Sequence, residues 1–146
     1  MDVTAELSCR ATPEAMFAVV SDLGTYGSWL DIVSRAVVAE ADHRDAGPAW
    51  SVDLRGQLGP LRRTKRLRMV RTVADPGGRV VFERFELDGR RHSDWVLSAD
   101  LVPDGDVVQL TMRLHYGGNL WVPVLDRLLA DEIERSSGRL AALVET

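Results

Sequence analysis

Residues 95–116 read WVLSADLVPDGDVVQLTMRLHY, two runs of alternating apolar and polar residues joined by a turn sequence. Alternation with a period of two is typical of a strand with one buried face, and Asp-Gly between two such runs indicates a tight hairpin. If Asp104 and Gly105 are the two turn residues, Pro103 faces Asp106, and apolar residues then pair across the hairpin. The expected pairs are Leu101 with Val108, Ala99 with Leu110, Leu97 with Met112 and Trp95 with Leu114. The sequence therefore predicts an antiparallel hairpin with one buried and one solvated face.

The stretch before this hairpin is divided by short turn sequences into further strand-like segments. The predicted strands are approximately 35–41, 49–56, 62–74 and 79–87, followed by the hairpin strands 92–102 and 106–117. The breaks between them are rich in glycine, proline and aspartate and are short, so they allow only antiparallel connections. This part of the chain is predicted to be an antiparallel meander of six strands.

The N-terminal segment predicts one more strand and two short helices. Residues 2–10 place apolar side chains at alternate positions, as a strand does. Thr12-Pro13-Glu14 then offers a hydroxyl N-cap, a proline at the first helical position and an acid in the first turn. Gly24 is expected to end this helix. A second short helix is expected to carry Trp29, Leu30 and Val33.

The C-terminal segment predicts a long amphipathic helix from about Trp121 to Val144, with Pro123 near its start. One stripe at helical spacing is apolar apart from one serine, whereas the opposite face carries charges of both signs. The stripe consists of Leu125, Leu128, Leu129, Ile133, Ser136, Leu140, Leu143 and Val144. A membrane-surface helix is usually more basic, so packing against the sheet is favoured.

The order of elements is strand, two short helices, six strands and a long helix, which makes a single α+β domain over residues 1–146. This order resembles the helix-grip fold of the START-like (SRPBCC) superfamily, which includes the polyketide cyclase/dehydrase and lipid-transport proteins. The segments that carry the resemblance are ATPEAMF at 11–17, SDL at 21–23 leading to Trp29, DGR at 88–90, WVL at 95–97, and LHYGG at 114–118 before Pro123. The resemblance implies a curved antiparallel sheet of about seven strands around the C-terminal helix, with a cavity between them.

The residues themselves favour the same cavity, because three helices cannot fully cover a strongly bent sheet of six or seven strands. The remaining volume is filled either by large side chains or by a ligand. Large apolar residues on the predicted inner faces are the candidate ligand contacts. They are Trp29, Trp50, Leu67, Met69, Trp95, Leu97, Met112, Leu114, Tyr116, Leu125 and Leu129.

Three charged residues share the parity of the predicted inner faces: Lys65 and Arg71 in the segment that contains Leu67 and Met69, and Glu83 in the next strand. A five-residue loop centred on Gly77 pairs Arg71 with Glu83, and a three-residue loop at 88–90 then places Glu83 opposite Trp95. Such a pair is either a structural ion pair or a polar site that binds and orients a ligand. Arg71, Glu83 and Tyr116 are therefore the candidate catalytic residues if the protein is an enzyme.

Composition excludes several other classes of protein. The 146 residues are 45% hydrophobic and 27% charged, with a net charge of −4 and a pI near 5.3, which argues against general nucleic-acid binding. The basic cluster at 62–71 is expected on a solvated face, paired with Glu86 and Asp53. The single cysteine, Cys9, and the lack of an apolar leader or spanning segment lead us to expect a cytoplasmic protein. Scattered histidines suggest no metal site, and no cofactor is expected.

Three functions remain compatible with these features. The first is binding of a hydrophobic small molecule, such as a lipid, an isoprenoid or quinone, or an aromatic polyketide. The second is a cyclase/dehydrase-like enzyme that uses inward-facing polar residues. The third is a protein-interaction module whose cavity is filled by its own side chains.

Overall fold

The computed structural model describes residues 2–58, 61–117 and 131–145, without the side chains of 56–58 and 61–63. Its described strands form one seven-stranded antiparallel sheet in the order β1-β7-β6-β5-β4-β3-β2. The strands are β1 Asp2–Cys9, β2 Val33–Val38, β3 Ala49–Leu58, β4 Leu61–Asp75, β5 Arg79–Arg84, β6 Trp95–Asp104 and β7 Val107–Tyr116. The predicted meander is confirmed, and β1 joins it by pairing with β7.

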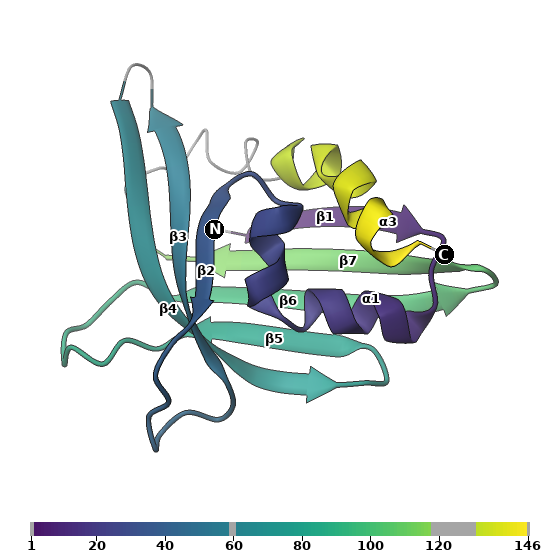
Figure 1. The fold of residues 1–146 in the computed structure, drawn as a ribbon. Helices are drawn as coiled ribbons and strands as arrows, with labels where there is room; N and C mark the ends of the chain where they lie inside the picture. The colour runs from purple at the N-terminus through teal and green to yellow at the C-terminus, as the bar shows by residue number, and fades with distance from the viewer. Residues whose placement is uncertain (1, 59–60, 118–130, 146) are drawn as a thin grey trace.

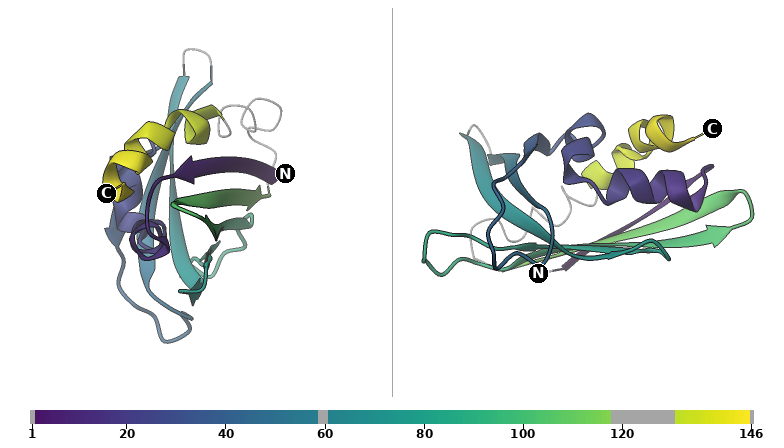
Figure 2. Two further views of the ribbon diagram at one scale, coloured as in Figure 1. Left: turned by 90° about the vertical axis from the view of Figure 1, so that its right-hand side faces the viewer. Right: turned by 60° about the horizontal axis from the view of Figure 1, so that its bottom comes forward.

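The sheet is strongly bent, so that β3 and β4 run across the direction of β6 and β7 (Figure 1). All described helices lie on one side of it, which we call the concave face (Figure 2). Helix α1 (Pro13–Val20) packs over β6, the 3-10 helix η1 (Leu23–Ser28) packs beside β2, and α3 (Ser137–Val144) packs over β1. The α+β helix-grip architecture expected from the sequence is confirmed.

The start of α1 follows the sequence prediction, whereas its end does not. The Thr12 hydroxyl accepts a hydrogen bond from the Ala15 amide at 3.1 Å, and Pro13 is the first helical residue. The helix ends at Val20 rather than at Gly24. Gly24 belongs to η1, where its backbone amide donates a 2.8 Å hydrogen bond to the Asp22 carboxylate. The second short helix is therefore this 3-10 turn, which ends at Ser28. The three residues predicted in it lie beyond its end, because Trp29 and Leu30 follow it and Val33 begins β2.

The C-terminal helix is interrupted in its described part. Residues 131–135 are helical, Ser136 is a turn residue, and α3 follows. The buried Ser136 hydroxyl donates a 2.6 Å hydrogen bond to the carbonyl of Glu132, a side-chain interaction that bends helices. Leu143, predicted in the apolar stripe, is 48% exposed because α3 turns it away from the sheet. The first part of the predicted helix lies outside the described residues.

The register of the last hairpin differs from the prediction by two residues. Trp95 faces Tyr116 and not Leu114, which lies opposite Leu97. The turn residues are Gly105 and Asp106, and only Gly105 has a positive φ, of 64°. Positive φ at the first central residue alone is the requirement of a type II′ turn, for which glycine is preferred. Because the shift is an even number of residues, the apolar face remains the buried one.

A β-bulge in β4 shifts the register between β4 and β5 by one residue. Next to the turn, Val73 pairs with Val81, as the predicted loop requires. Beyond Thr72, which has no partner on β5, Arg71 pairs with Phe82. One extra residue on one strand transfers every following side chain of the partner to the other face. The bulge therefore decides which residues of β5 point toward the concave face.

Gly78 offers a test of the tight packing between this turn and β6. Its φ is +137°, and a Cβ there would lie 2.6 Å from the Leu101 carbonyl oxygen, whereas Gly105 has open space around it. We expect Gly78→Ala to lower the free energy of unfolding by about 2 kcal/mol, from backbone strain and the enforced shift of β6. Gly105→Ala has backbone strain only and should lose about 1 kcal/mol. Urea unfolding measures both, and equal losses would contradict the close approach to β6.

Candidate functional site

A cluster of four aromatic side chains lies between η1 and the concave face. The rings of Tyr26 and Trp29 are 4.9 Å apart, and Phe82 contacts both Tyr26 at 6.2 Å and Trp50 at 5.7 Å. The Tyr26 hydroxyl donates a 2.7 Å hydrogen bond to the carbonyl of Val20. Burial raises the pKa of Tyr26 far above its usual value, so the phenol is neutral and structural.

A second aromatic pair lies where β6 begins and β7 ends. The rings of Trp95 and Tyr116, which face each other across the two strands, are 5.3 Å apart. Both side chains are buried. The ammonium of Lys65, from the neighbouring part of β4, lies 6.0 Å from the centre of the Trp95 ring. This end of the concave face therefore combines aromatic surface with a positive charge.

The described candidate contacts all belong to the core of the concave side or pack against it. Eight are buried and Leu97 is half-buried: Trp29, Trp50, Leu67, Met69, Trp95, Leu97, Met112, Leu114 and Tyr116. The remaining two, Leu125 and Leu129, lie outside the described residues. That these side chains contact a ligand stays a prediction.

Three buried indole groups of this set have no hydrogen-bond partner. The Nε1–H donors of Trp29, Trp50 and Trp95, which we call the indole donors, are inaccessible to solvent and have no acceptor in the part of the chain that the structure describes. A buried donor without an acceptor costs about 1–3 kcal/mol, and native proteins contain few of them. The sequence indicated the three tryptophans as contacts but not that their donors would be unpaired.

The predicted pairing of Arg71 with Glu83 is wrong. The bulge at Thr72 moves Glu83 to the exposed face, where it pairs with Val70 on one side and with Val96, not Trp95, on the other. Arg71 remains on the concave side, where its guanidinium donates a 2.9 Å hydrogen bond to the carbonyl of Ser21 and lies 6.0 Å from the ring of Trp50. Arg71 thus ties the end of α1 to the sheet.

The same bulge brings Arg84 onto the concave side, a residue that sequence reasoning missed. Its side chain is 9% exposed, and its Nε donates a 2.7 Å hydrogen bond to Glu86. The two other guanidinium nitrogens reach the Ser93 carbonyl at 3.4 Å and the His92 Nδ1 at 3.3 Å. The other ring nitrogen of His92 lies 2.8 Å from the carboxylate of Asp88. The connection between β5 and β6 therefore holds this guanidinium from three sides.

Lys65 lies beside Arg84 on the concave side. The half-buried ammonium has no hydrogen bond or ion pair with any described residue, in contrast to Arg84. Burial lowers the pKa of Lys65 and the positive charge of Arg84 lowers it further, against an opposing effect of the Glu86 carboxylate. This lysine was noted in the sequence as sharing the inner parity of Leu67 and Met69, and the structure confirms that position.

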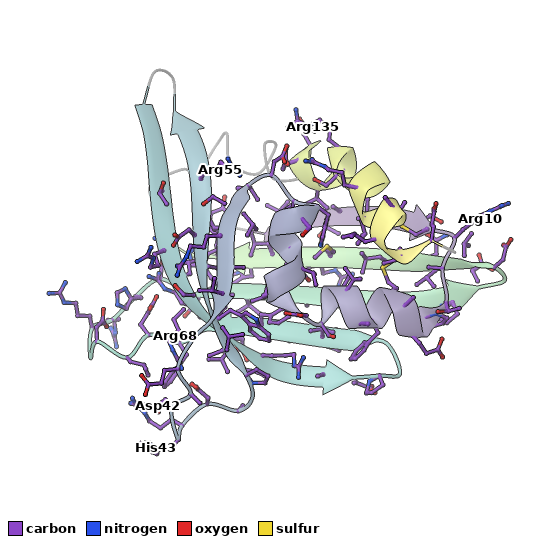
Figure 3. All side chains as sticks on the ribbon, in the orientation of Figure 1. Arg10, Asp42, His43, Arg55, Arg68 and Arg135 are labelled. Carbon is purple, nitrogen blue, oxygen red and sulfur yellow. The ribbon has the colours of Figure 1, made fainter. Side chains whose placement is uncertain are left out.

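Two other basic residues of this segment, Arg66 and Arg68, form ion pairs on the opposite, convex face. Arg66 forms a bidentate ion pair with Asp53, with hydrogen bonds of 2.7 and 3.0 Å. The predicted pairing of the basic cluster with Asp53 is confirmed. Arg68 pairs with Asp45 at 2.9 and 2.6 Å and lies near the loop that carries Asp42 and His43 (Figure 3). Glu86, predicted as a second partner, pairs instead with Arg84 and accepts only the backbone amide of Arg68.

Two further findings concern only the described part of the chain. Its histidines, cysteine and carboxylates form no group of three or more that could hold a metal ion. None of its helices combines the length and the apolar character needed to cross a membrane.

Comparison with known families gives a match over almost the entire chain. The model of the family described as "Polyketide cyclase / dehydrase and lipid transport" matches residues 1–145. No curated protein sequence matches the chain.

Solved structures with a similar fold come from bacteria and plants. A START superfamily protein from Mycobacterium smegmatis has a TM-score of 0.72 and 17% identity over 98% of this chain and 96% of its own. The major latex-like protein 151 of Panax ginseng has a TM-score of 0.68 and 10% identity over 97% of this chain and 95% of its own. The di-domain ARO/CYC protein StfQ of the steffimycin biosynthetic pathway has a TM-score of 0.63 and 16% identity over 97% of this chain and 48% of its own. At these identities the likeness extends to the fold alone.

Proposed function

Because the chain belongs to the polyketide cyclase/dehydrase and lipid-transport family, we propose that it binds a hydrophobic small molecule between the concave face of its sheet and the C-terminal helix. The proposed contacts are the aromatic and aliphatic side chains of the concave side, among them Trp29, Trp50, Trp95 and Met112. An apolar wall of this kind is typical of sites for lipids, quinones and aromatic polyketides.

The observation that carries this proposal is the set of three indole donors. A site lined by apolar groups with a few convergent polar groups binds apolar ligands and orients them through those polar groups. A ligand with carbonyl, hydroxyl or ether oxygens would supply acceptors that the described residues do not offer to Trp29, Trp50 and Trp95. A pure hydrocarbon would leave all three donors unpaired. The proposed ligand is therefore an oxygenated apolar molecule.

An enzyme of the cyclase/dehydrase type is the second candidate. Its support is the presence of Arg71 and Tyr116 on the concave side. Its weakness is that Glu83, the proposed proton acceptor, is exposed on the other face. Binding without chemistry needs only the apolar wall and the indole donors, so we favour it.

The ligand is best sought on protein purified from its own host. Native mass spectrometry should show a bound species, and extraction should identify an oxygenated apolar molecule. Two probes, the quinone menadione and the aromatic polyketide emodin, test the same site by quenching of tryptophan fluorescence. A clean mass together with no uptake of either probe would contradict the proposal and favour an interaction module with a filled core.

Trp95→Phe and Trp50→Phe then test the role of the indole donors, because they keep the aromatic ring and remove the N–H. In the protein without ligand, the loss of an unpaired buried donor should offset part of the packing that is lost with the larger indole, so the net change in stability should be small. Affinity for the ligand should fall about fivefold to tenfold where that donor is used. Val38→Thr on the exposed edge strand β2 is the control and should change neither quantity. Unchanged affinity in both tryptophan variants would contradict ligand recognition by these donors.

A further inference from the structure

We propose that Lys65, together with the indole N–H of Trp95, recognises a carboxylate, so that the ligand of this protein is an apolar molecule that ends in a carboxylate group. This inference rests on the proposed function and specifies the chemical class of its ligand. The charged end of the ligand would then lie between Lys65 of β4 and Trp95, the first residue of β6.

The first argument is that the ammonium of Lys65 has three N–H donors, and none of them has an acceptor among the described residues. By contrast, the guanidinium of Arg84 has an acceptor in Glu86, and that of Arg68 on the convex face has one in Asp45. The ammonium lies over the face of Trp95, and its distance of 6.0 Å from the ring centre is the outer limit of a cation–π contact. The Glu86 carboxylate, which is hydrogen-bonded to Arg84, acts on this ammonium through its charge alone. A half-buried ammonium whose N–H donors have no acceptor is costly, and a bound anion removes that cost.

The second argument is that Arg84 adds positive charge without competing for the ligand. Its guanidinium donates to Glu86, Ser93 and His92, so each of its three nitrogens already has an acceptor. The charge of the Glu86 carboxylate acts on both cations, and one carboxylate does not balance two positive charges. The local field therefore favours one negative charge at this end of the concave face.

The third argument is that a carboxylate matches the donors present. Its two oxygens accept hydrogen bonds from two directions. The ammonium of Lys65 lies over the Trp95 ring, 6.0 Å from its centre, and the Nε1–H at the edge of that ring has no acceptor among the described residues. Hydrogen bonds in which both partners are charged are about twice as strong as neutral ones. The surrounding aromatic surface of Trp95 and Tyr116 then contacts the apolar part next to the carboxylate.

The sequence makes this inference unusually easy to test, because Lys65 is the only lysine of the chain. Reductive methylation with a carbon-13 label modifies only the Lys65 side-chain amine and the N-terminal amine, and both amines keep their positive charge. The resonance missing from labelled Lys65→Met protein is that of Lys65. Its pKa, lowered in the free protein, should rise when dodecanoic acid or 9-anthracenecarboxylic acid binds, because an adjacent negative charge favours the charged amine. Dodecanol and 9-anthracenemethanol, the neutral counterparts, should leave it unchanged.

Affinities measured by isothermal titration calorimetry complete the test. Lys65→Met should weaken binding of the acids about tenfold or more and leave binding of the alcohols unchanged. Lys65→Arg keeps the charge and should retain most of the affinity for the acids, which excludes a loss caused by misfolding. Arg66→Met, on the convex face and 67% exposed, is the matched control and should change neither affinity.

The outcomes separate the two proposals. Preference for the acids that disappears in Lys65→Met supports both. Equal binding of acids and alcohols, unaffected by Lys65→Met, would overturn the carboxylate inference and leave the proposed function standing. A protein that binds none of the four probes in any form would count against both.

Discussion

Replacing Phe82 with alanine is expected to lower the free energy of unfolding by about 4 kcal/mol, the largest loss we expect from a single core substitution. Phe82 is fully buried and is the residue through which the rings of Tyr26 and Trp50 are joined. Its removal leaves a cavity between η1 and the sheet. It also removes two edge-to-face ring contacts, each of which stabilises the fold beyond the effect of the buried apolar area. Urea unfolding followed by circular dichroism measures the loss.

Phe85→Ala is the matched control, because it deletes the same side chain three residues later. Phe85 is 36% exposed and its ring contacts the guanidinium of Arg44 rather than the core. We expect a loss of about 1 kcal/mol or less. Comparable losses for the two variants would contradict the central position of Phe82 in the core, and with it the parity that the bulge in β4 gives to β5.

The fold was predictable because local signals and long-range pattern agree along most of the chain. The alternation in the last two strands, the turn residues between all six strands of the meander and the N-cap at Thr12 each indicate the same arrangement. The structure confirms seven antiparallel strands with boundaries within a few residues of those expected. The even shift of the last hairpin left the buried face unchanged, so an error in register caused no error in the core.

The candidate site was less predictable, because it depends on one bulge. Nothing in the residues around Thr72 marks the extra position, since a bulge on a non-glycine residue needs no special side chain. Yet this single residue exchanges Glu83 for Arg84 on the concave side and turns the expected ion pair with Arg71 into separate interactions. A charged pair predicted across two strands is therefore correct only if no bulge shifts the register between the turn and that pair.

Tertiary contacts also decide the roles of polar groups that the sequence presents as equivalent. The segment 62–71 offers five arginines and one lysine at both odd and even positions, and parity alone separates them into two faces. The structure adds that the convex arginines Arg66 and Arg68 have carboxylate partners from β3 and from the loop before it, whereas Lys65 has none. Those partners are distant in sequence, so no local pattern identifies which cation is left unpaired.

Breaking the ion pair between Arg68 and Asp45 is the second change with a large expected effect. The side chains are only 11% and 3% exposed, and the guanidinium of Arg68 also donates to the carbonyls of Glu40 and Phe85. Arg68→Met leaves Asp45 buried without its partner, and we expect the free energy of unfolding to fall by about 3 kcal/mol. Adding Asp45→Leu to Arg68→Met should restore part of the loss, because the unpaired charge is removed.

The exposed pair of Arg79 and Asp100 provides the control for that experiment. Its side chains are 51% and 33% exposed, so Arg79→Met should cost less than about 1 kcal/mol. If Arg79→Met cost as much as Arg68→Met, the effect of Arg68 could not be attributed to a buried pair. If the double variant were no more stable than Arg68→Met, the carbonyl contacts rather than Asp45 would account for the loss.

The same pair predicts how stability depends on pH. The hydrogen bonds from Arg68 hold the pKa of Asp45 below its ordinary value of 3.8. A carboxyl group with a lowered folded pKa stabilises the protein above its unfolded pKa, and this contribution is lost as the pH falls from about that value through the folded pKa. Asp42 and Asp53 also have lowered pKa values and titrate in the same range, so the comparison must be made between variants. Below pH 4 the free energy of unfolding should fall more steeply for the wild-type protein than for Asp45→Asn. Parallel curves of this free energy against pH would show that Arg68 does not lower the pKa of Asp45 on folding.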